Sequence, residues 1–112
     1  MQIIISGRNV ALAESLREHM EERFGRLARF DEGVSRIDVT LSEEKNRCTV
    51  EANVSVRRGA MVHARAEAPE FRTAVDRVYE KLSRQLKKSR ERVRDRKGGV
   101  ELSAGLTEEM ES

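Results

Sequence analysis

The residues best suited to binding chemistry gather near the C-terminal end, between Glu80 and Gly99. This stretch holds nine Lys or Arg against three Asp or Glu, a net +6 in a chain whose total is +2. Residues 100–112 carry four Glu and no Lys or Arg, whereas residues 1–79 are neutral, with 13 bases and 13 acids. A one-signed block of this kind indicates an anionic partner more strongly than the overall pI does.

The spacing of four of these cations, together with Arg77 just before them, places them on one side of a helix. At 100° per residue, these five fall within about 80° of one another. This basic stripe consists of Arg77, Lys81, Arg84, Lys88 and Arg92. Cations one helical turn apart suit a row of phosphates, so the stripe favours a nucleic acid partner. An acidic protein, a lipid surface and a merely solvated helix face remain as alternatives.

Other reactive residue types form no recognisable active site. Cys48 falls on the inward side of a strand, which is typical of an inert buried thiol. His19 and His63 lie far apart and lack a Cys or carboxylate at ligand spacing, which argues against a zinc site. No nucleophile elbow, P-loop or GxGxxG motif occurs. We therefore expect no catalytic residue, metal, cofactor or small-molecule substrate, and no enzyme.

The N-terminal elements are a strand and a helix. Residues 2–6 are mostly β-branched and end at Gly7, which predicts a strand followed by a turn. Arg8 lies in that turn and is a further candidate for RNA contact. Over residues 12–30, apolar side chains recur every three or four positions, which predicts an amphipathic helix that Gly25 weakens locally.

The pattern then changes to strict alternation. Residues 34–42, 47–58 and 61–68 each alternate apolar and polar side chains over most of their length, which predicts three strands with one buried face. The short connections predict an antiparallel meander. Pro69 ends the last strand, and a helical pattern runs from residue 70 to about residue 95.

These elements predict a single α+β domain. The order β-α-β-β-β-α favours a two-layer fold in which both helices pack on one face of a four-stranded sheet. The position of the first strand in the sheet stays open. We expect the domain to span residues 1–97, and residues 98–112 to form a flexible acidic tail or the start of a linker. One cysteine, no membrane-length apolar segment and no signal peptide favour the cytoplasm and no membrane partner.

Four segments of the sequence resemble a known family: "MQIIISGRNV", "LREHMEERFGRLARF", "VTLSEEKN" and "AVDRVYEKLSRQLKKSRERV". The family is that of ribosome hibernation promoting factor and ribosome-associated inhibitor A, also labelled sigma-54 modulation proteins. The resemblance covers about residues 1–97. It implies a fold similar to double-stranded RNA-binding domains and a cytoplasmic factor that binds 16S rRNA of the small ribosomal subunit. Such a factor occupies the mRNA and tRNA channel and blocks translation in stationary phase or stress.

The resemblance also implies particular RNA-binding residues. Carried over by position, the basic pattern of the family falls on Lys81, Arg84, Lys88, Arg90, Arg92, Arg23 and Arg26. The predicted RNA-binding set adds Lys87, on the flank of the basic stripe, and Arg8. Two departures concern helix starts: Glu70-Phe71-Arg72 replaces Asp-Met-Tyr, and Ala13 replaces a Thr that often caps the first helix.

Several functional alternatives stay open. The chain resembles a stand-alone inhibitor with an acidic tail, and equally the N-terminal piece of a longer factor whose second domain pairs two ribosomes. Ribosome dimerisation is therefore undecided. A general double-stranded RNA-binding module would carry the same fold and basic stripe. A regulatory protein-interaction domain is the third hypothesis.

Overall fold

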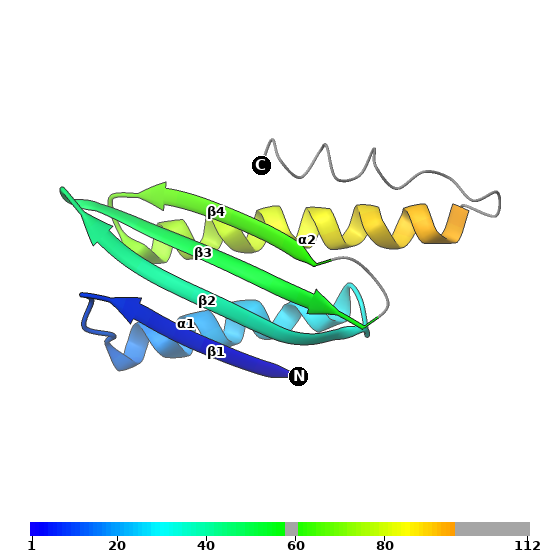
Figure 1. Cartoon of the computed structure of the whole chain (residues 1–112), viewed down its shortest axis with the longest axis horizontal. Helices are drawn as coiled ribbons and strands as arrows, with labels where there is room; N and C mark the ends of the chain where they lie inside the picture. The colour runs from blue at the N-terminus through cyan, green and yellow to red at the C-terminus, as the bar shows by residue number, and fades with distance from the viewer. Residues whose placement is uncertain (58–60, 96–112) are drawn as a thin grey trace.

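The computed structural model describes residues 1–57 and 61–95, with side chains up to Lys88 in the last helix. The elements are β1 (Gln2–Arg8), α1 (Glu14–Gly25), the 3-10 helix η1 (Arg26–Arg29), β2 (Val34–Glu44), β3 (Arg47–Val56), β4 (Val62–Ala68) and α2 (Phe71–Asp95). This order confirms the predicted β-α-β-β-β-α arrangement (Figure 1). The predicted tail, residues 98–112, lies outside the described residues.

The four strands form one sheet in the order β1-β2-β3-β4. Strands β2, β3 and β4 pair antiparallel as the predicted meander. Strand β1 takes an edge position and pairs parallel with β2, a direction that the α1 crossover between them allows. Both helices lie behind the same face of the sheet, which confirms the predicted two-layer fold (Figure 1).

The β2–β3 hairpin closes through a short turn, as predicted, and the turn has two residues. Glu44 pairs with Arg47, and the two residues between them, Lys45 and Asn46, have φ values of 50° and 63°. Positive φ at both central positions matches the right-handed twist of the flanking strands. The other predicted turn includes residues 58–60, which lie outside the described residues.

Alternation along the strands creates the core. The buried inward-facing strand residues include Ile37, Val39, Leu41, Val50, Ala52, Val54, Val62, Ala64, Ala66 and Ala68. Met20 and Phe24 of α1 and Leu82 of α2 pack against them as fully buried side chains. Strand β4 contributes mostly alanines to this face, and these small side chains let α2 approach β4 closely.

Helix α1 is shorter than the sequence pattern predicted. It begins at Glu14 rather than near residue 12, and α-helical geometry ends at Gly25, where the 3-10 helix begins. A Cβ on Gly25 would meet no atom within 4 Å, so packing does not require glycine there. The low helix propensity of glycine is a sufficient reason for the change of helical type.

Replacing Ala13 with Ser is expected to stabilise the protein by about 1 kcal/mol. Ala13 occupies the N-cap of α1 with extended backbone angles and makes no side-chain capping bond. A Ser hydroxyl there would accept a hydrogen bond from an unpaired N–H of the first turn. Urea unfolding measures the gain. Ala11→Ser, an exposed position before the cap, is the control, and an equal gain there would contradict the capping explanation.

Candidate nucleic-acid interface

The basic stripe of α2 begins along the edge of the sheet. Three α2 side chains spaced four residues apart donate hydrogen bonds to alternate carbonyls of β4. We call these three side chains the β4-edge ladder: Arg77 Nη1 to Glu67 O at 2.9 Å, Lys81 Nζ to Arg65 O at 2.9 Å, and Gln85 Nε2 to His63 O at 3.0 Å. The sequence pattern did not predict these contacts of Arg77 and Lys81 with the sheet, and it assigned no role to Gln85.

Matching repeat lengths explain the ladder. Four residues of an α-helix rise about 6 Å, and two residues of a strand rise about 6.7 Å. Each of the three side chains therefore lies beside the next outward-facing carbonyl of β4. Strand β4 is an edge strand, whose outward carbonyls would otherwise lack strand partners. The ladder therefore protects this edge from pairing with another chain and fixes the basic stripe relative to the sheet.

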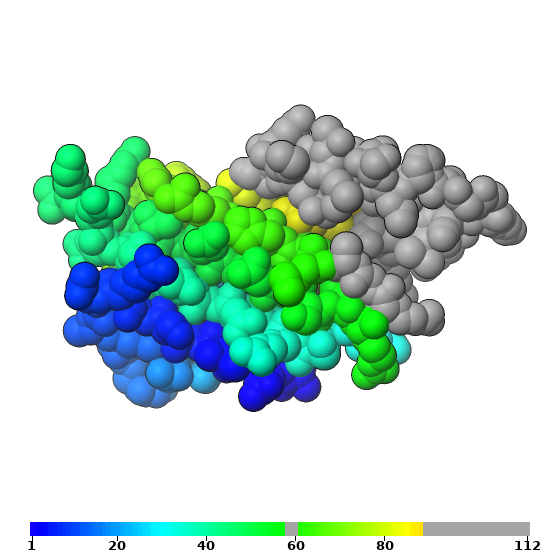
Figure 2. Space-filling view, in the orientation of Figure 1, coloured from blue at the N-terminus to red at the C-terminus, as the bar shows by residue number. Residues whose placement is uncertain are grey.

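The other predicted α2 residues whose side chains the structure describes face solvent. Arg84, Lys87 and Lys88 are exposed, and they follow Lys81 within two helical turns. The side chains of Arg90 and Arg92 lie outside the described residues, although the α2 backbone extends past both. Together with Arg77 and Lys81, the exposed cations give α2 a positively charged outer surface next to the β4 edge. Figure 2 shows atoms of α2, in yellow, emerging beside β4.

The predicted α1 residues are arranged differently. Arg23 lies at the seam between the two helices, with its Nε 3.2 Å from Asp76 Oδ1 and its Cζ 6.0 Å from the centre of the Tyr79 ring. Arg26 Nη2 donates to Glu22 Oε2 at 2.7 Å within α1. Both arginines are partly exposed. Part of each guanidinium group is already bonded within the protein, so only the remaining N–H groups are available to a partner.

Arg8 is not grouped with the α2 cations. It is exposed at the end of β1 and pairs in register with Ser42 of β2. The residues that lie opposite Ser42 across the neighbouring strands are partly or fully exposed. Ile3 and Ile5 of the same strand pack against the core, so alternation directs Arg8 to the opposite, open face of the sheet. An RNA contact from Arg8 therefore requires a partner that reaches around the sheet.

Sequence reasoning missed a polar cluster between α1 and α2. His19 Nε2 lies 2.9 Å from Asp76 Oδ1, and Arg72 Nη1 lies 3.5 Å from His19 Nδ1. The carboxylate that contacts His19 comes from the other helix, not from a residue at metal-ligand spacing along the sequence. The i,i+4 spacings of His19 with Arg23 and of Arg72 with Asp76 place each pair on one helix face, but they do not show that the two faces meet. Within the part of the chain that the structure describes, no group of three metal-ligand side chains occurs.

Cys48 is expected to react slowly with thiol reagents in the folded protein. Its side chain is 6% exposed, and its Sγ donates to Pro69 O at 3.5 Å. Burial, with Glu43 and Glu70 nearby, raises the pKa of the Cys48 thiol, so less reactive thiolate is present at pH 8 than for an ordinary thiol. The rate of alkylation should rise sharply in denaturant. Equal rates in folded and unfolded protein would contradict this.

The described surface of α2 is dominated by charged side chains. No helix in the described ranges is both long and apolar enough to cross a membrane. The largest concentration of exposed cations follows α2, and the fully buried residues belong to one continuous core.

Known proteins resemble this chain over most of its length. The family model described as "Sigma 54 modulation protein / S30EA ribosomal protein" matches residues 3–94. A ribosome hibernation promoting factor from Escherichia coli (strain K12) is 34% identical over 94 residues, covering 84% of this chain and 98% of the relative. A factor of the same name from Azotobacter vinelandii is 35% identical over 99 residues, covering 88% and 92%.

Solved structures agree with the sequence comparisons. A ribosomal subunit interface protein from Coxiella burnetii has a TM-score of 0.76 and 30% identity, covering 81% of this chain and 99% of that chain. The N-terminal domain of Thermus thermophilus Protein Y has a TM-score of 0.73 and 28% identity, covering 80% and 99%. With its sequence and its fold both matching over most of their length, this chain belongs to the sigma 54 modulation protein / S30EA ribosomal protein family.

Proposed function

We propose that this protein is a ribosome hibernation factor that binds 16S rRNA of the small ribosomal subunit. It occupies the channel for mRNA and tRNA, and it blocks translation by occupancy rather than by catalysis. The proposed contacts are the predicted set: Arg8, Arg23, Arg26, Lys81, Arg84, Lys87, Lys88, Arg90 and Arg92. The observation that carries the proposal is the basic stripe, held against the β4 edge by the ladder.

Electrostatics and family membership support the same partner. The exposed cations of α2 would displace counterions from rRNA phosphates, which gives salt-dependent affinity. Arg84 adds a planar guanidinium suited to bidentate phosphate contact. The relatives from E. coli and A. vinelandii are named ribosome hibernation promoting factors, and the C. burnetii neighbour is named a ribosomal subunit interface protein.

Direct binding and competition test the proposal. The purified protein should co-sediment with bacterial small subunits at low salt, and the bound fraction should fall as salt increases. Saturating the subunits beforehand with mRNA and tRNA should prevent binding, because the proposed site is shared. Failure of the folded protein to sediment with subunits would overturn the proposal. Undiminished binding to subunits filled with mRNA and tRNA would overturn the channel location.

One further comparison distinguishes binding to ribosomal subunits from a general preference for duplex RNA. Competition with an unrelated RNA duplex at equal phosphate concentration should release little protein from small subunits. If the unrelated duplex releases as much protein as free small subunits do, a general RNA-binding function replaces the ribosomal proposal.

A further inference from the structure

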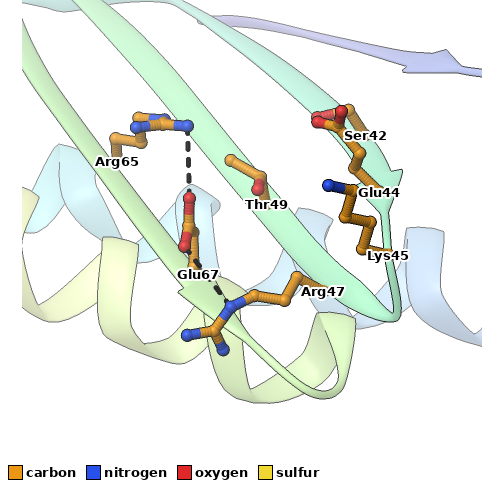
Figure 3. A pocket seen from close by; sticks show the side chains of 7 residues that line it. All are labelled: Ser42, Glu44, Lys45, Arg47, Thr49, Arg65 and Glu67. Atoms are coloured by element: carbon orange, nitrogen blue, oxygen red, sulfur yellow. Dashed lines mark hydrogen bonds and ion pairs between the residues drawn. The ribbon is translucent and has the colours of Figure 1, made fainter.

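The open face of the sheet contains a polar hollow at the end nearest the β2–β3 turn (Figure 3). Its volume is about 460 Å³, and its lining includes three cations, two carboxylates and two hydroxyl groups. The cations are Lys45 in the turn, Arg47 on β3 and Arg65 on β4. The lining therefore carries a net positive charge and hydrogen-bonding groups from three strands and a turn.

Two guanidinium groups in the hollow converge on one anionic position. Glu67 Oε1 lies 3.7 Å from Arg47 Nε, and Glu67 Oε2 lies 3.3 Å from Arg65 Nη2 (Figure 3). Arg47 and Arg65 come from neighbouring strands, with the carboxylate between them. All three side chains are substantially exposed, so each can exchange its partner at little energetic cost. The carboxylate thus marks a place where both arginines can hold a negative oxygen.

This hollow lies one strand away from the basic stripe. Lys81 donates to the carbonyl of Arg65, and Arg77 donates to the carbonyl of Glu67. Arg65 and Glu67 of β4 therefore contact α2 through their backbone carbonyls and line the hollow with their side chains. The stripe and the hollow therefore meet across strand β4.

We propose that the hollow binds a phosphate group of RNA that lies along the basic stripe. Arg47 and Arg65 are the phosphate ligands, and Glu67 holds both arginines in place until the phosphate displaces it. The RNA interface then crosses the β4 edge and continues onto the open face of the sheet. The inference rests on the proposed function and extends its contact surface from the helices to β3 and β4.

Single substitutions in the full chain test the inference with small ribosomal subunits as the probe. Arg65→Gln should weaken binding several-fold and lower the salt slope by about one, as expected for one lost phosphate contact. Glu67→Gln should strengthen binding, because it removes the competing carboxylate without removing either arginine. Opposite effects from two neighbouring side chains are not expected from a general loss of folding.

A matched control lies on the same face of the sheet. Arg36 pairs with Asp38 and is 50% exposed, close to the 55% of Arg65, but it lies about 20 Å along β2 from Ser42, which lines the hollow. Arg36→Gln should bind like wild type. If Arg65→Gln behaves like Arg36→Gln while wild type binds normally, this inference fails and the proposed function stands. If wild type itself does not bind subunits, the proposed function fails.

The chemical class of the partner is tested by photo-crosslinking. A photoreactive amino acid at Thr49, a partly exposed residue lining the hollow, should attach the protein to rRNA in the complex with small subunits. Attachment to a ribosomal protein instead would overturn the assignment of the hollow to an RNA phosphate.

Discussion

Replacing Lys81, Arg84 and Lys88 together with Glu is expected to abolish binding to small ribosomal subunits. Three lost phosphate contacts at about 1 kcal/mol or more each correspond to at least a hundredfold weaker affinity. Reversed charges add repulsion from neighbouring phosphates. Co-sedimentation at low salt, with circular dichroism to verify folding, measures the effect. Binding within a fewfold of wild type would remove α2 from the interface and favour a regulatory protein-interaction role.

Two controls separate local contact from net charge and from lost structure. Arg17, Arg29 and Arg36 replaced with Glu make the same change of net charge outside the proposed contacts, and binding should survive largely intact. Gln at positions 81, 84 and 88 removes charge while keeping an amide that can serve the β4 edge, as Gln85 does with His63 O. This variant should keep wild-type stability and still lose most of the affinity.

Replacing Phe24 with Ala is expected to destabilise the fold by about 3–5 kcal/mol. Phe24 is 0% exposed and is among the largest fully buried side chains, where α1 meets the core. The loss is a large share of the 5–15 kcal/mol that typical domains possess, so a fraction of the protein will be unfolded near growth temperature. Urea unfolding followed by circular dichroism measures the change in the free energy of unfolding.

Phe71→Ala is the matched comparison for the core prediction. Phe71 is only partly buried and starts α2, where alanine also improves helix propensity. Its loss should therefore be clearly smaller. Similar losses at the two positions would contradict the central role assigned to Phe24. At temperatures where the Phe24→Ala protein remains folded, its subunit binding should match wild type, because the buried side chain of Phe24 cannot contact RNA.

The charge-reversal prediction depends on the β4-edge ladder. Lys81 belongs to the ladder and to the proposed RNA contacts, so its substitution alone mixes structure with binding. Arg84 is exposed and takes no part in the ladder, so its contribution to binding is measured without that complication. Comparing the Glu variant with the Gln variant therefore separates the two effects better than a single substitution does. Both variants remove the positive charges, but only the Glu variant also loses the hydrogen bond from position 81 to the carbonyl of Arg65.

Local patterns in the sequence were sufficient for the elements and their buried faces. Alternation in β2, β3 and β4 depends only on the direction of neighbouring side chains, and the three- and four-residue spacing of α2 depends only on helical geometry. For the same reason the cationic surplus of α2 could be placed opposite its apolar face. The hairpin turn at Lys45 and Asn46 was also accessible, since short turns have local requirements.

Contacts between distant residues had to be decided by the tertiary structure. The β4-edge ladder joins residues 10, 16 and 22 positions apart, and the His19–Asp76 contact joins residues 57 apart. No periodicity reports such distances, because they depend on how α2 and α1 pack across the sheet. The parallel edge position of β1, the open-face placement of Arg8 and the convergence of Arg47 and Arg65 on Glu67 have the same origin. The sequence by itself determined which faces are apolar and where positive charge accumulates, whereas strand order and helix packing decided which charges meet.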